Sequence, residues 1–151
     1  MKQTTLVTRA SQISLAIAEL LFLVFLASPT FIDSVTSEGT VTMLPGYAAV
    51  AWCAVVLPSV VVRYPREAAI LFPLLLAHVG FIILPALVLL RRFRPWLLRV
   101  CFSALFVVGF VSMATLIGRS ERVGFGAYLW LIAAIAAATF CLLPRDDPNR
   151  E

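Results

Sequence analysis

The chain has 151 residues, of which 62% are hydrophobic and only 13% are charged. A soluble domain is about half apolar and about a quarter charged, so this composition excludes an ordinary soluble protein and indicates that lipid is the solvent. The net charge is +4, but no segment is long enough to form the solvated basic surface that a nucleic-acid partner requires. We therefore expect a single-domain, all-α integral membrane protein in contact with the lipid bilayer.

Five apolar runs follow one another along the chain, at residues of about 13–31, 47–62, 68–90, 96–117 and 124–143. Each run that spans a membrane must be helical, because lipid offers no hydrogen-bonding partners to an open backbone. A transmembrane helix needs roughly 20 residues, so the third, fourth and fifth runs are long enough. The second run is at the short limit, and the first qualifies if Glu19 is tolerated. The sequence thus predicts a multi-pass transmembrane helical bundle with short loops.

The loop at residues 32–46 indicates which side of the membrane the N-terminus faces. This loop contains Asp33 and Glu38 but no Lys or Arg, and loops of this kind face away from the cytoplasm. The N-terminus, which carries Lys2 and Arg9, is then cytoplasmic. The Arg-, Ala- and Val-rich composition and the minimal loops are typical of prokaryotic proteins, so we expect a location in an inner (plasma) membrane.

The number of crossings stays open between four and five. If all five runs cross, the Lys and Arg residues divide about equally between the two sides, against the usual cytoplasmic excess. If residues 47–62 do not cross, the cytoplasmic side holds Lys2, Arg9, Arg91, Arg92, Arg94, Arg99, Arg145 and Arg150. We therefore predict four transmembrane helices, with residues 47–62 re-entrant or packed against the bundle near its outer surface. A five-helix bundle is the alternative, because residues 47–62 carry no charge.

Glu19 is the most unusual residue of the predicted spans, because a carboxylate inside a bilayer is costly unless it is paired, protonated or in contact with water. One interpretation is a proton-titrating carboxylate in a small transporter. The other is a bundle-facing Glu19 that pairs with His78, with an arginine or with a backbone carbonyl. In that second interpretation Glu19 lies only about six residues into its span, where water can reach it.

His78 is the only histidine and lies near the centre of the third run. Imidazole titrates close to physiological pH, so a proton relay with Glu19 is one hypothesis. A neutral His78 that is hydrogen-bonded to a neighbouring helix is the other. Cys53, Cys101 and Cys141 form no CxxC or CxxH spacing and lie in apolar runs, which favours small buried side chains and no metal site.

Small residues in the last two runs predict helix-packing surfaces. Ala133 and Ala137 are four residues apart in the fifth run, and Gly109 and Ser112 form a smaller surface of the same kind in the fourth. Small side chains let helices approach closely in lipid. The sequence leaves open whether these surfaces meet helices of the same chain or of a partner.

The sequence contains no catalytic motif, and Glu19 and His78 are too few to form an active site. We therefore expect no enzyme activity, no cofactor and no metal. The favoured function is a small non-enzymatic membrane component: an accessory subunit, an assembly factor or an oligomeric scaffold, whose partner is a second copy or a larger membrane protein. One alternative is a small oligomeric transporter or ion pathway that uses Glu19. A further alternative is a membrane effector or immunity-type protein that binds its partner through residues 32–46.

Overall fold

The computed structural model describes residues 2–35, 41–90, 96–120 and 123–143. The helices are α1 (Lys2–Ala27), α2 (Gly46–Arg63), α3 (Pro65–Leu89), α4 (Trp96–Arg119) and α5 (Phe125–Leu142), and the strands are β1 (Pro29–Val35) and β2 (Val41–Pro45). Each of these helices is long and apolar enough to cross a membrane. The prediction of a helical membrane bundle is therefore confirmed, while length and composition alone do not decide how many helices cross.

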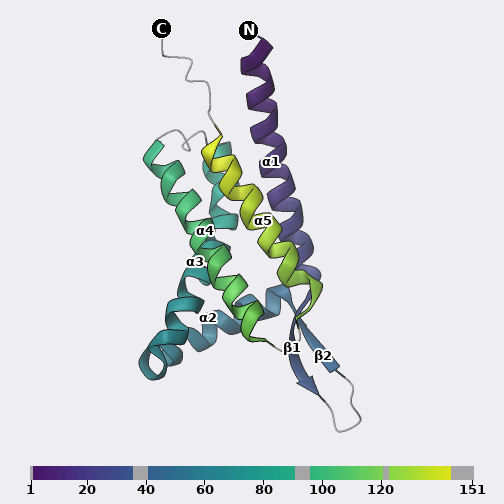
Figure 1. The fold of residues 1–151 in the computed structure, drawn as a ribbon, viewed down its shortest axis with the longest axis vertical. Coiled ribbons are helices and arrows are strands. Elements are labelled where there is room, and N and C mark those ends of the chain that lie inside the picture. The colour runs from purple at the N-terminus through teal and green to yellow at the C-terminus, as the bar shows by residue number, and fades with distance from the viewer. Residues whose placement is uncertain (1, 36–40, 91–95, 121–122, 144–151) are drawn as a thin grey trace.

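The long axis of the molecule is followed by α1, α3, α4 and α5, and α2 lies across it (Figure 1). α1 and α4 run toward the hairpin formed by β1 and β2, whereas α3 and α5 run away from it. α5 packs against both α1 and α4, and α4 packs against α3. We call the end that carries the hairpin the hairpin end, and the end at which α1 begins and α5 finishes the terminal end. α2 lies at the hairpin end, beside α3.

The core lies between the four long-axis helices and consists of small and aromatic side chains. Ala133, Ala134 and Ala137 of α5 are at most 1% exposed, and small residues on one face let α1 and α4 approach α5 closely. Ser14 Oγ of α1 donates a hydrogen bond to Ala136 O of α5 at 2.8 Å. The largest fully buried side chains are Trp130, Phe25, Phe81, Phe106 and Phe140. The interior of the bundle is thus filled by close packing of large rings against alanines.

The segment predicted as a loop contains an antiparallel β-hairpin instead. The sequence also predicts that the first apolar run continues to Phe31, and this is wrong: α1 ends at Ala27 and β1 begins at Pro29. Proline has no backbone N–H, and it disfavours the helical conformation in the residue that precedes it. Pro29 therefore ends the helix although apolar residues follow.

Two backbone hydrogen bonds donated by glycines join the base of the hairpin to the starts of α2 and α5. Gly46 N, at the start of α2, donates to Ser28 O at 3.0 Å, and Gly124 N, directly before α5, donates to Thr30 O at 2.9 Å. A Cβ atom on Gly126 would lie 2.7 Å from Thr30 Oγ1, so this approach requires a residue without a side chain. The turn from α1 to β1 is therefore held in one position at the hairpin end.

Candidate functional site

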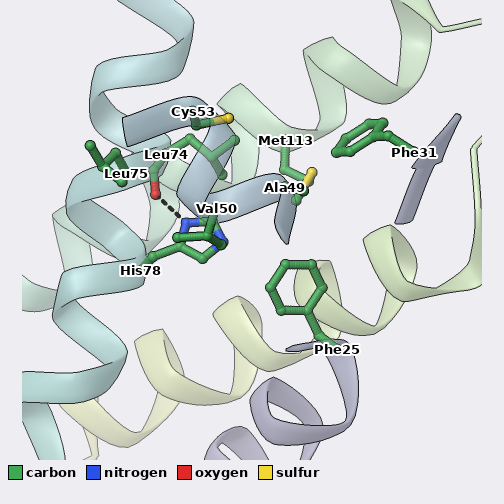
Figure 2. A pocket seen from close by; sticks show the side chains of 9 residues that line it. All are labelled: Phe25, Phe31, Ala49, Val50, Cys53, Leu74, Leu75, His78 and Met113. Atoms are coloured by element: carbon green, nitrogen blue, oxygen red, sulfur yellow. Dashed lines mark hydrogen bonds between the residues drawn. The ribbon is translucent and has the colours of Figure 1, made fainter. Parts of the chain in front are cut away.

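His78 lies near the middle of α3, and its side chain is only 4% exposed. Nδ1 lies 2.6 Å from Leu74 O, one helical turn earlier in the same helix (Figure 2). A carbonyl oxygen can only accept, so Nδ1 carries the proton and donates it. Nε2 is buried and bonds to no described group. The predicted hydrogen bond from His78 to another helix is therefore wrong, because the bond lies within α3.

Aromatic rings from α1 and α5 surround the imidazole of His78. Its ring centroid lies 5.9 Å from that of Phe22, 5.5 Å from that of Phe25 and 5.2 Å from that of Trp130. Phe22 in turn stacks on Phe81 of α3, with the two centroids 4.4 Å apart. These rings bury large apolar surfaces, so His78 lies in a mainly aromatic environment at the centre of the bundle.

Glu19 is partly buried on α1, and its Oε1 atom has no hydrogen-bond partner among the described residues. The stretch of α1 from Ala10 to Ala27 is long and apolar enough to cross a membrane. At 1.5 Å per residue, Glu19 is about 12–14 Å from either end of this stretch. Glu19 thus lies near the middle of this stretch, while its depth in the membrane stays a prediction.

The structure does not bring Glu19 and His78 into contact. α1 and α3 run in opposite directions (Figure 1), and Phe22 contacts both His78 and Phe81. Glu19 precedes Phe22 by about one turn, so it lies at the level beyond Phe81, on the side away from His78. The pairing of the two residues and the direct proton relay between them are therefore not formed in the described structure.

A small cavity of about 20 Å³ lies beside His78, between α2, α3 and α4 (Figure 2). It is lined by Phe25, Phe31, Ala49, Val50, Cys53, Leu74, Leu75, His78 and Met113. Such a volume has room for roughly one water molecule. Cys53 comes from α2 and Met113 from α4, so two sulfur-containing side chains line the same space as the imidazole. A histidine that has no cysteine near it in the sequence therefore has one near it in space.

The four predicted packing residues are all buried inside the chain. Ala133 and Ala137 are 0% exposed, and Ser112 is 6% exposed. A Cβ atom on Gly109 would lie 2.6 Å from Ala77 Cβ, so α3 and α4 approach each other where Gly109 leaves room. These residues meet helices of the same chain and are not available as an intermolecular surface.

Arg99 has a role that the sequence does not reveal. It stands in the first turn of α4, where its Nε donates to Cys141 O at 2.9 Å and a terminal nitrogen donates to Leu143 O. The last carbonyl groups of a helix have no partner within the helix and carry partial negative charge, so a guanidinium stabilises them. Arg99 therefore joins the start of α4 to the end of α5. From the sequence, Arg99 is predicted only to lie on the cytoplasmic side of the membrane.

Comparison with known proteins assigns no function to this arrangement. No family model matches the chain, and neither a curated protein nor a solved structure matches it.

Proposed function

We propose that the protein is a small non-enzymatic membrane component, an accessory subunit, assembly factor or scaffold that acts by binding another membrane protein. The observation that carries this proposal is the filled centre of the bundle. Aromatic rings around His78 leave a cavity of about 20 Å³, whereas pockets for small-molecule substrates measure about 300–1,000 Å³. Such a centre suits a rigid support better than a catalytic or transport site.

The crosswise position of α2 supports an arrangement with four crossings. If the long axis of the bundle is the membrane normal, α1, α3, α4 and α5 cross and α2 does not (Figure 1). The terminal end then carries Lys2, Arg9 and Arg99, and it is also the end at which α3 finishes and α4 begins. Because cytoplasmic segments carry an excess of Lys and Arg, we assign this end to the cytoplasm, and an inner (plasma) membrane of a prokaryote fits this orientation.

The outward face of α2 is the surface that we assign to the partner. Trp52, Val55 and Val62 are 56%, 79% and 82% exposed, and only 11% of the helix is buried, against 50% of α5. A helix that lies in the plane of a membrane surface normally has one polar face, but α2 carries no charge before Arg63. Contact with a helix of a larger membrane protein would cover this apolar face.

Native mass spectrometry of the tagged protein, extracted gently from its own membrane, tests the proposal. We expect it to emerge bound to a different, larger polypeptide. Val55→Asn should lower the bound fraction at least severalfold, because it places an amide in the apolar contact. Val111→Asn, an equivalent change on the exposed face of α4, should leave the complex intact. Release of the wild-type protein as a lone monomer would contradict the proposal.

The unpaired carboxyl group of Glu19 supports a second candidate, a small oligomeric transporter or ion pathway. An ionisable group inside a span is a common feature of proton and ion routes. In that case Glu19→Gln abolishes proton or cation flux in reconstituted liposomes, and Glu67→Gln, at the exposed start of α3, leaves it unchanged. The accessory-subunit proposal predicts no specific flux from wild type or from either variant.

A further inference from the structure

We propose that a groove between α4 and α5 holds one acyl chain of an anionic phospholipid, whose phosphate group contacts Arg99. The two helices pack side by side (Figure 1), and the groove between them measures about 190 Å³. This lipid site is separate from the surface of α2 that we assign to a protein partner. It requires only that α4 and α5 cross the membrane, as they do in both the four-crossing and the five-crossing arrangement.

The lining of the groove is apolar and offers no hydrogen-bond donor to a ligand. Ala134 and Ala138 line it and are buried, whereas Val107 and Ile135 line it and are exposed, so the small side chains form its floor. Thr139 is the one lining residue with a polar side chain, and its hydroxyl donates to Ile135 O at 2.8 Å. A polar occupant would lose its hydrogen bonds to water here without replacement. The groove therefore suits a hydrocarbon chain.

The groove extends over about half of α5, which matches one leaflet of a bilayer. Its α5 residues run from Ala134, near the middle of the helix, to Leu142, at its end. At 1.5 Å per residue, these two residues lie roughly 12 Å apart along the helix axis. One leaflet contributes about 15 Å, half of a hydrocarbon core of about 30 Å. A lipid tail from the leaflet at the terminal end fits this length, whereas a partner helix would cross both leaflets.

Arg99 supplies a positive charge at the terminal end of the groove. Its guanidinium donates to Cys141 O and Leu143 O, the two residues on either side of Leu142, which lines the groove. Arg99 and Phe106, another lining residue, are seven positions apart in α4. This spacing is close to two helical turns, so both residues lie on one face of the helix. The positive charge and the apolar groove are therefore aligned along the same face of α4.

A lipid phosphate is the anion that this position favours. Both recorded hydrogen bonds of Arg99 are to carbonyl groups, so no carboxylate among the described residues neutralises its charge. The side chain is only partly buried, and a guanidinium binds phosphate oxygens through several N–H donors. In the orientation that we propose, the terminal end faces the cytoplasm, and cytoplasmic leaflets carry anionic lipids.

Native mass spectrometry of the full-length protein, freed of lipid in detergent, tests the inference by adding back one lipid at a time. Dioleoyl phosphatidylglycerol and dioleoyl phosphatidylcholine have identical tails, and only the first has a net negative headgroup. We expect wild type to bind one phosphatidylglycerol per chain about fivefold more tightly than phosphatidylcholine, the effect of one basic residue beside an anionic lipid. This comparison needs no variant. Equal affinity for the two lipids would overturn the inference.

Two variants separate the headgroup contact from the tail contact. Arg99→Gln should abolish the preference for phosphatidylglycerol, and Arg119→Gln, at the other end of α4, should keep it. Ala138→Leu fills the floor of the groove and should weaken the binding of both lipids severalfold. Ala104→Leu, the same change at an exposed position of α4 outside the groove, should bind like wild type.

Three variant results would contradict the inference. One is a preference for phosphatidylglycerol that survives in Arg99→Gln, and another is wild-type binding of both lipids by Ala138→Leu. The third is a wild-type dimer that Ala138→Leu dissociates, because a second copy of the chain would then cover the groove.

Discussion

At the residue scale, the hairpin end depends on glycines that permit backbone segments to approach each other. Added Cβ atoms on Gly46 and Gly124 would collide with backbone atoms of Phe25 and Pro29, and one on Gly126 would collide with the turn from α1 to β1. Backbone atoms cannot move aside as a flexible side chain can. The position of the hairpin is therefore set by the absence of side chains at these three places.

Gly126→Ala should lower the stability of the folded protein by about 1–3 kcal/mol, the usual cost of overpacking. The new methyl group would lie 2.7 Å from Thr30 Oγ1 and 2.9 Å from Pro29 O. Thermal unfolding in detergent measures the change as a lower Tm. Gly118→Ala is the matched control, because a Cβ atom there meets nothing within 4 Å. Equal Tm values for the two variants would show that the base of the hairpin is not tightly packed.

The sequence identifies Glu19 and His78 but not their surroundings. Ionisable residues in apolar runs are conspicuous because charge is costly in lipid. Their neighbours depend on how α1 and α3 are aligned, and hydrophobic periodicity does not specify that alignment when most faces of a helix are apolar. For the same reason, the sequence gives no sign that Cys53 and Met113 line the same cavity as His78.

At the element scale, helix positions follow from the apolar runs, whereas helix ends and directions do not. The predicted runs at 68–90, 96–117 and 124–143 match α3, α4 and α5 within a few residues. The hairpin was not predicted, because Pro29 interrupts an apolar run that composition alone treats as continuous. The crosswise direction of α2 depends on its contacts with α3 and the hairpin, which a local pattern does not contain.

Arg99→Gln should loosen the end of α5. The guanidinium hydrogen bonds to Cys141 O and Leu143 O are lost, and hydrogen bonds to charged groups contribute about 1.5–3 kcal/mol when they are shielded from water. Hydrogen–deuterium exchange should become faster at the amides of the last turn of α5 and stay unchanged at its start. Arg119→Gln, at the other end of α4, should not alter exchange in α5. Unchanged exchange in Arg99→Gln would mean that this contact does not hold the two helices together.

At the scale of the whole molecule, two independent features support the same arrangement in the membrane. The distribution of Lys and Arg favours four crossings, and the long axis is shared by four helices (Figure 1). The first feature comes from the sequence and the second from the packing of α1, α3, α4 and α5. In the arrangement that we propose, α2 does not cross the membrane and its apolar face contacts a partner.

The most direct test of the four-crossing arrangement is the side of the membrane on which Thr42 and Tyr64 lie. Thr42 stands in β2, before α2, and Tyr64 directly follows α2. Thr42→Cys and Tyr64→Cys, each in a chain whose native cysteines are replaced by serine, are treated with a membrane-impermeant maleimide in intact cells. Thr4→Cys in α1 reports on the side that we propose to be cytoplasmic. We predict that positions 42 and 64 react in intact cells and that position 4 reacts only after lysis. Reaction of position 42 in intact cells with position 64 protected until lysis would show that α2 crosses the membrane, and would contradict the four-crossing account.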